Sequence, residues 1–465
     1  MNGGLKMKSK FWAIAVATLA LSGASHPALA ADLGGNCCAD LEERIAELEA
    51  TTARKGNRKV SLEVSGQINE TLLAWDDGFE SNIGVYTNDN SRSRFRFTGK
   101  AKMDGDWEAG YRIEIGVRAA NSKRFTQDDP TGSSNPSDVG FDLRDSFWFV
   151  KSKTLGAVSV GNQATATDAI TELNQTQTAD FSKFSDVEDS GLGLFLRGTN
   201  GAKSGESWRR LIGIGGDQPG EGERRFTAVK YISPEFAGFA ISAAWGEDDF
   251  WDVALRYKGE FAGISVNAGI GYGSITDGVQ TKTVCAAVQA TGLGADTSCD
   301  QFGGSVSLLH SATGLFLNAG AGQKTDDLLN KTDLFTGLNA DGEQTFWALQ
   351  GGIEKKWLPV GKTTIYGEYY EYEGGATTRR FAEDDAIIPA GFDRAAVWTS
   401  GVQSYGFGLA QGFDAAAFVA YLNWRHYESD LTVINSTGGA GIAGTQTEVD
   451  LEGLDVVQAG GIIKF

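Results

Sequence analysis

The sequence predicts an all-β fold, namely a 16-stranded antiparallel transmembrane β-barrel with a short N-terminal periplasmic helix. Polar and apolar residues alternate along many short segments, and a period of two is that of the side chains on a β-strand. Glycine is abundant at 62 of 465 residues, whereas proline is scarce at 7. Short turns alternate with long polar connections along the chain, and this arrangement is typical of a transmembrane barrel.

Residues 1–30 have the features of a secretory signal peptide. Lys8 and Lys10 precede an apolar run over 11–21, and the segment ends on the small residue Ala30. Such a segment is removed when a protein is exported. Because a barrel is expected after it, we predict a protein of the cell outer membrane of a Gram-negative bacterium.

Residues 31–59 hold the strongest helical pattern, "CADLEERIAELEATTARKG". Leu41, Ile45 and Leu48 are spaced four and three residues apart with charged residues between them, as in a heptad repeat. Two heptads are too short for a stable isolated helix. Two interpretations stay open: a solvated periplasmic helix, or a short coiled coil between identical chains.

The barrel is expected over 60–465, and its first hairpin turns at "DGD", residues 104–106. Tight turns between two alternating runs are typical of hairpins. Further hairpins are expected over 140–161, 225–246, 250–273, 302–322, 343–373 and 400–426, the last around "AQG" at 410–412, with single strands over 60–73 and 456–465. Together these segments give the 16 strands.

The stretch "SRSRFRFTG" at 91–99 places arginines on one face of a strand and Phe95 and Phe97 on the other. In a membrane barrel the apolar face contacts lipid and the polar face lines the lumen. The turn at 104–106 sets the register, so Arg96 is expected opposite Glu114. The predicted pore-lining residues of the wall are Arg92, Arg94, Arg96, Arg112, Glu114, Arg118 and Arg144.

Three segments carry a resemblance to a known family: "CADLEERIAELEATTARKGNRKVSLEVSGQIN", "SRSRFRFTGKA" and the C-terminal "GGIIKF". They resemble the alphaproteobacterial (rhizobial-type) outer-membrane porins, and the likeness covers essentially the whole mature chain. It implies a homotrimer in outer-membrane lipid that forms passive water-filled channels for small hydrophilic solutes and ions. The terminal Phe465 resembles the signal that the barrel assembly machinery reads.

In general porins the third long loop folds back into the barrel and narrows it, so the resemblance implies a constriction loop at 162–224. Its predicted pore-lining acids are Asp168, Glu172, Asp180 and Asp186. Lys183 is the single cation between 162 and 192. If the acids face the arginines, the opposite charges roughly offset, and we expect weak ion selectivity with a slight preference for cations.

Two alternatives to a general porin stay open. Tyr366, Tyr370 and Tyr372 alternate on one strand and would suit a stacking track in a sugar-selective channel. The mature terminus Ala31-Asp32 resembles termini that are attached to peptidoglycan, which would make the barrel an anchor between outer membrane and cell wall.

Other functional classes have little support in the sequence. The three histidines show no metal or catalytic spacing, so we expect no enzyme activity, no metal and no cofactor. The net charge of −19 argues against nucleic-acid binding. Cys285 and Cys299 lie in one loop of an exported protein and predict a disulfide, while the state of Cys37 and Cys38 stays open.

Overall fold

The computed structural model describes residues 59–132, 139–212, 218–221, 225–246, 250–276, 298–326, 342–375, 385–388, 390–392, 394–436 and 445–465. These residues belong to a compact unit that spans Asn57–Phe465. The predicted signal peptide and the predicted helix with Leu41, Ile45 and Leu48 lie outside the described residues. In the described part of the chain, none of the helices is long and apolar enough to cross a membrane.

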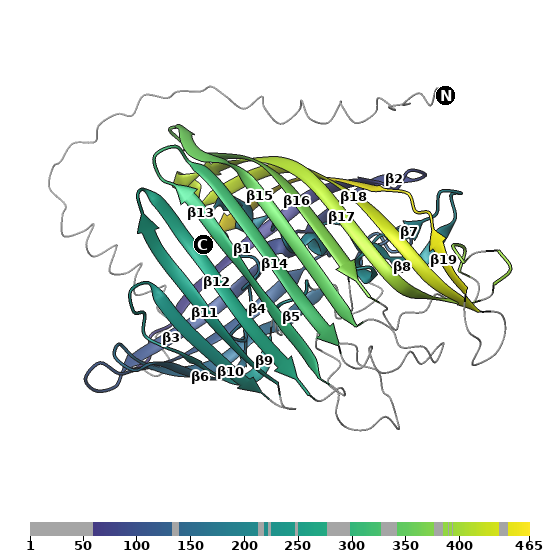
Figure 1. Cartoon of the computed structure of the whole chain (residues 1–465). Coiled ribbons are helices and arrows are strands. Elements are labelled where there is room, and N and C mark those ends of the chain that lie inside the picture. The colour runs from purple at the N-terminus through teal and green to yellow at the C-terminus, as the bar shows by residue number, and fades with distance from the viewer. Residues whose placement is uncertain are drawn as a thin grey trace, which may run out of the picture. The chain divides into compact units, whose positions relative to one another are not determined.

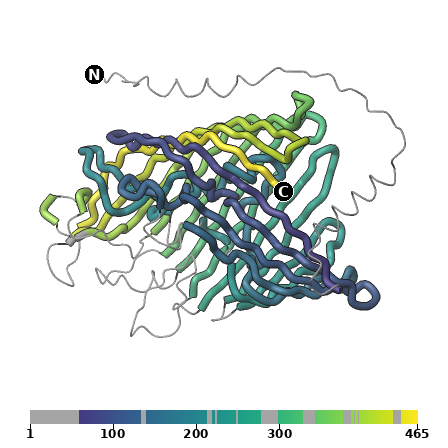
Figure 2. The backbone as a smooth tube through the Cα atoms, turned by 180° about the vertical axis from the view of Figure 1, so that it is seen from behind, coloured from purple at the N-terminus to yellow at the C-terminus, as the bar shows by residue number. Residues whose placement is uncertain are grey.

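A closed 16-strand antiparallel barrel forms the fold, as predicted. Its strands are β1 (Glu63–Asp76), β3 (Arg94–Lys102), β4 (Glu108–Arg118), β5 (Gly140–Ser152), β6 (Gly156–Gln163), β9 (Phe226–Ile232), β10 (Phe239–Gly246), β11 (Trp251–Phe261), β12 (Ile264–Ile275), β13 (Cys299–His310), β14 (Leu315–Asp326), β15 (Glu343–Leu358), β16 (Gly361–Gly374), β17 (Arg394–Phe413), β18 (Phe418–Ser436) and β20 (Leu454–Lys464). The strands lie side by side in chain order (Figure 1). The last strand pairs with the first, which closes the barrel (Figure 2).

Two short strands extend the wall beyond the ends of longer ones. β2 (Ser81–Thr87) pairs with the later half of β1, while β3 pairs with the earlier half. β19 (Thr445–Val449) continues along β18 beyond the end of β20. A 3-10 turn, η2 (Asp89–Ser91), separates β2 from β3. The second and last strands of the barrel are therefore each interrupted.

The final hairpin turn differs from its prediction. We expected it around "AQG" at 410–412, but the ladder of β17 and β18 continues to the pair Phe413–Phe418. The chain then turns through η6 (Asp414–Ala416) and Ala417, which has a positive φ of 45°. The sequence around Gln411 and Gly412 predicts a turn. In the structure both residues stay in the ladder, where Gln411 pairs with Ala420 and Gly412 with Val419.

The outer surface of the barrel is apolar. On β11, Val253 and Leu255 are 40% and 37% exposed, whereas the intervening Asp252 and Ala254 are buried. The same alternation places Trp347 and Leu349 of β15 outward and Gln350 inward. Apolar side chains on a strand face suit contact with lipid hydrocarbon.

The segment after β6, residues 164–212, lies inside the barrel, and we call it the inner segment. It contains η3 (Gln177–Asp180), η4 (Val187–Asp189), the hairpin β7 (Phe195–Arg197) and β8 (Lys203–Ser207), and η5 (Trp208–Arg210). Its hydrogen-bond partners are inward-facing side chains of the wall, such as Asp252, Ser307 and Gln350. Its apolar residues pack with inward tyrosines in one buried cluster, in which Leu194 and Trp208 lie beside Tyr370 and Tyr427.

Candidate functional site

The strand register brings the predicted arginines together on the inner face of β3, β4 and β5. Arg96 pairs with Glu114 across β3 and β4, as predicted, and Thr98 pairs with Arg112. The ladder of β4 and β5 shifts by one residue, so Glu114 pairs with Asp145 and Ile115 with Leu143. Arg144 is the extra residue of this β-bulge. Since a bulge re-aims side chains, Arg144 and Asp145 both reach the same inner face.

Four guanidinium groups surround the single carboxylate of Glu114, which is fully buried. The donors are Arg94 Nη1 at 3.4 Å, Arg96 Nε at 2.7 Å, Arg112 Nη2 at 2.9 Å and Arg144 Nε at 2.6 Å. Charge-assisted bonds of this kind are among the strongest hydrogen bonds in proteins. One carboxylate offsets only one of the four positive charges.

Arg92 and Arg118 form the adjoining part of the same surface. Both guanidinium groups contact Asp89, at 3.3 and 2.9 Å, and both contact Asp142, at 2.9 and 3.7 Å. We call the six residues Arg92, Arg94, Arg96, Arg112, Arg118 and Arg144 the arginine cluster. Its acidic partners are Asp89, Glu114, Asp142 and Asp145.

Each predicted acid of the inner segment pairs with a cation outside the arginine cluster. The pairs are Asp168–Arg225 at 3.5 Å, Glu172–Lys183 at 2.8 Å, Asp180–Lys464 at 2.7 Å and Asp186–Lys183 at 3.4 Å. Asp168 alone approaches the cluster, because Arg225 also contacts Asp145 at 2.9 Å. The structure therefore brings the wall residues together, but it does not place these acids in ion pairs with the arginines of the cluster.

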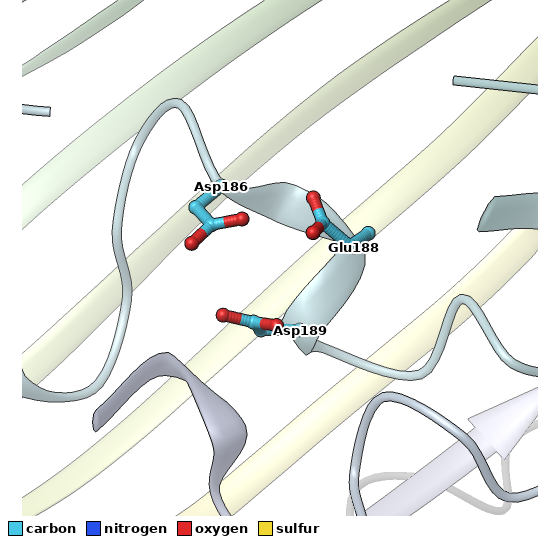
Figure 3. Close-up of side chains that lie close together, drawn as sticks. All are labelled: Asp186, Glu188 and Asp189. Atoms are coloured by element: carbon cyan, nitrogen blue, oxygen red, sulfur yellow. The ribbon is translucent and has the colours of Figure 1, made fainter. Parts of the chain in front are cut away.

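A further acidic group lies deep in the inner segment around η4. Carboxylate oxygens of Asp186, Glu188 and Asp189 lie within 4.8 Å of one another (Figure 3), and all three residues are buried. Oxygen donors at this spacing suit a divalent cation. However, the Lys123 ammonium group contacts Glu188 and lies 3.2 Å from Asp189, so a protein cation already occupies this side of the group.

Carboxylates on the opposite wall hold the inner segment by its backbone, a role that the sequence did not suggest. Asp252 accepts hydrogen bonds from the amides of Ala166 and Thr167, at 3.0 and 2.7 Å, and from the Thr167 hydroxyl at 2.6 Å. Glu354 accepts a hydrogen bond from the Gln177 amide at 2.7 Å. The sequence contains one signal for this role. Asp252 is a carboxylate that alternates with the outward apolar residues Trp251 and Val253 of β11.

A buried ion pair holds the middle of the inner segment. Arg425 of β18 donates to Glu368 of β16 at 2.6 Å and to the Lys183 carbonyl at 2.7 Å. Both ionic side chains are at most 5% exposed. Burial of an ion pair is favourable only when its hydrogen bonds are well satisfied, and here Ser182 adds a further partner to Arg425 at 3.0 Å.

Glu221 forms a second contact with the start of the inner segment. Its carboxyl group accepts hydrogen bonds from the Thr171 hydroxyl and amide, at 2.5 and 2.9 Å. Burial, together with the negative charge of Glu172, raises the pKa of Glu221 to about 8. The carboxyl group is therefore largely protonated at neutral pH.

The remaining predicted residues have other surroundings. Tyr366, Tyr370 and Tyr372 are at most 3% exposed because the inner segment covers them, which leaves no stacking track for a sugar on this strand. Cys299 is disulfide-bonded, but Cys285 lies outside the described residues, so their pairing stays a prediction. Phe465 exchanges backbone hydrogen bonds with Gly66 where the barrel closes.

Comparison with known proteins identifies the family and related barrel folds. A family model described as Gram-negative porin matches residues 15–423. The anion-selective porin from Comamonas acidovorans is 15% identical, with 87% of this chain and 100% of that chain covered and a TM-score of 0.50. The in-vitro-folded outer membrane protein OmpT of Vibrio cholerae is 14% identical, with 88% and 99% covered and a TM-score of 0.48.

The outer membrane channel DcaP of Acinetobacter baumannii is 10% identical, with 89% of this chain and 100% of that chain covered and a TM-score of 0.47. No curated protein sequence matches the chain.

Proposed function

The chain belongs to the Gram-negative porin family, and we propose that solutes cross its barrel between the arginine cluster and the inner segment. The protein is an outer-membrane channel for the passive diffusion of small hydrophilic solutes and ions. In this proposal the pore-lining residues are the arginine cluster on one side, with Asp168 and Glu172 on the other. The inner segment, residues 164–212, acts as the constriction loop predicted at 162–224.

One observation carries the proposal: among the described residues, the inner segment forms no hydrogen bond or ion pair with β3, β4 or β5. Its anchors include Asp252 of β11, Glu354 of β15, Glu368 of β16 and Arg425 of β18, with further contacts on β1, β13 and β20. The arginine cluster lies on β3–β5, with Arg92 just before β3, and its Arg96 and Arg112 side chains are 33% and 32% exposed. Solvent-accessible charge beside a fixed polar segment is the arrangement that a narrow aqueous pore needs.

Single-channel recording tests this function directly. Purified protein in a planar bilayer should give stepwise, ohmic conductance that persists at low voltage. A chain that only anchors the outer membrane to the cell wall would give none, although it would still bind peptidoglycan. Absence of conductance from correctly folded protein, shown by a heat-dependent shift on a gel, would contradict the channel function.

We propose that three copies assemble through the wall near the closure. Ala459 and Gly461 of β20 alternate with the buried Gln458 and Ile462 and therefore face outward. Small residues allow close approach of neighbouring chains in a membrane. A large side chain at Ala459 should dissociate trimers on a native gel, whereas Ile45→Pro, in the predicted helix, should leave them intact.

Other features of the rhizobial-type porins are part of the same proposal. They are cleavage of residues 1–30, a Cys285–Cys299 disulfide, recognition of Phe465 by the assembly machinery and attachment of the mature N-terminus to peptidoglycan. We expect no catalytic activity, because transport through an open pore needs no reacting group. Mass spectrometry of the mature protein, with and without reduction, would test the cleavage site and the disulfide together.

A further inference from the structure

The arginine cluster carries more positive charge than its partners offset. Six arginines make ion pairs with four carboxylates, those of Asp89, Glu114, Asp142 and Asp145. Within the described residues, the inner segment contributes no acid to these pairs. Each arginine contacts a carboxylate, but the six positive charges exceed the four negative ones by two.

The charges around Glu114 are also layered, with the positive groups toward the solvent. The Arg96 and Arg112 side chains are 33% and 32% exposed, whereas Glu114 between them is 0% exposed and Asp145 is 4% exposed. Around Glu114, an ion in the pore therefore meets guanidinium groups before the carboxylate, whereas beside Arg92 and Arg118 the carboxylate of Asp142 is itself 31% exposed. Because Coulomb energy falls with distance, the exposed layer determines the sign of the interaction.

Several guanidinium N–H groups of the cluster have no acceptor in the described part of the protein. Arg144 donates to Glu114 through Nε alone, so its two terminal nitrogens remain available. Arg112 contacts Asp145 through Nε and Glu114 through Nη2, and Arg96 donates to Glu114 through Nε and Nη2. Nη1 of each arginine therefore remains available to a ligand. Arginine presents its five donors as a planar fork that matches the oxygens of carboxylate and phosphate.

Most acids of the inner segment are paired with other cations, although the negative charge of Asp189 acts on Arg92. Asp186 is buried and contacts Lys183, and the more exposed Asp180 lies 2.7 Å from Lys464. Asp168 contacts Arg225. The charge balance therefore differs from the expectation that loop acids offset the arginines.

We propose that the arginine cluster is a binding site for small oxyanions of the phosphate class and gives the channel a preference for anions. The proposal rests on the channel function and names its solute class. Terminal nitrogens of Arg96, Arg112 and Arg144 would donate to the oxygens of the anion. Each uncompensated charge about 7 Å from a passing ion changes its local concentration about threefold in a water-like dielectric.

Bilayer recording with inorganic phosphate as the probe tests the proposal. In a KCl gradient the wild-type reversal potential should have the sign of an anion-selective pore. Added phosphate should reduce the chloride current in a dose-dependent way that saturates. Arg96→Gln with Arg112→Gln should move the reversal potential toward cation selectivity and abolish the block by phosphate.

A second pair of variants separates charge from donor geometry. Arg96→Lys with Arg112→Lys keeps the charge but removes the fork, so the reversal potential should stay near wild type while the block weakens. Lys356→Gln removes a positive charge at a distant turn, where Lys356 pairs with Asp414, and should change neither measurement. The heat-dependent gel shift verifies that each barrel is folded.

Three results would overturn the proposal. They are a cation-selective wild-type channel, a phosphate effect that never saturates, or an unchanged reversal potential in the glutamine variants. In each case the channel still conducts, so passive diffusion through the barrel would stand, but an unchanged reversal potential would also remove Arg96 and Arg112 from the pore lining. Loss of all conductance in the wild type would instead contradict the channel function itself.

Discussion

The two sides of the barrel interior treat charged residues in different ways. On β3–β5, arginines crowd around a few buried carboxylates, and the outermost guanidinium groups reach the solvent. On β11–β18, carboxylates such as Asp252 and Glu368 are covered by the inner segment and receive hydrogen bonds from it. The first side keeps charge available to a passing ion, whereas the second uses charge to hold a polypeptide segment in place.

The two sides differ because their charged side chains find their ion-pair and hydrogen-bond partners in different parts of the chain. The wall supplies both signs of charge on β3–β5, so that side is complete without the inner segment. The opposite wall supplies carboxylates whose partners are backbone amides of Ala166, Thr167 and Gln177. Changes on the anchoring side should therefore affect stability first, and changes on the arginine side should affect selectivity first.

The largest effect is expected at the buried ion pair of Arg425 and Glu368. Arg425→Met leaves the Glu368 carboxylate buried without its cation and should cost roughly 3–5 kcal/mol of unfolding free energy. The double variant Arg425→Met with Glu368→Met removes both charges and should recover much of that loss. Denaturant unfolding of the refolded barrel in detergent measures both. A double variant less stable than the single one would contradict this account.

A smaller loss is expected at Asp252, where one carboxylate holds two amides and a hydroxyl. Asp252→Asn replaces charge-assisted hydrogen bonds by neutral ones and should cost about 1–3 kcal/mol. Because the start of the inner segment is loosened, single-channel current should also become noisier. Asp430→Asn, on the outward face of β18, is the matched control. Quiet current with unchanged stability would show that Asp252 is not an anchor.

Alternation and turn chemistry predicted the arginine side well. The turn at 104–106 places Arg96 opposite Glu114, because a hairpin with a defined turn fixes its register. The bulge at Arg144 could not be foreseen, since one extra residue changes the alternation only locally. The sequence therefore predicted which arginines share a face, but not that four of them meet at one carboxylate.

The anchoring side was much less predictable. Lys464 pairs with Asp180, and Lys123 with Glu188, although these residues are far apart in the chain. Period-two alternation distinguishes the inner from the outer face, but it does not distinguish a water-filled lumen from one filled by protein. For that reason Tyr370 was a candidate for the pore lining, whereas it lies buried under the inner segment.

A selectivity experiment compares the two sides directly. Asp168→Asn with Glu172→Gln removes two acids of the inner segment that already contact Arg225 and Lys183. The reversal potential should therefore shift only slightly toward anions, by less than the opposite shift in Arg94→Gln with Arg96→Gln. Both pairs are measured in the same salt gradient. Equal and opposite shifts would show that the two sides contribute equal fields.

The smallest effect is expected from the protonation of Glu221, and it depends on pH. Burial and the charge of Glu172 raise the pKa of this carboxyl group from 4.5 to about 8. Between these two values the folded protein holds a proton that the unfolded chain has released. Stability should therefore fall as the pH rises through this window and should level off above it.

Glu221→Gln removes this dependence while it keeps a neutral side chain that can accept the Thr171 hydrogen bonds. The measurement is the unfolding midpoint of wild type and variant at several values between pH 5 and pH 9. The wild-type midpoint should decline relative to that of the variant across the window, because deprotonation places an additional negative charge beside Glu172. Glu235→Gln, which alters an exposed carboxylate in the turn between β9 and β10, should keep the wild-type pH dependence. Parallel curves for Glu221→Gln and wild type would mean that Glu221 carries no proton in this range and that another contact holds the start of the inner segment.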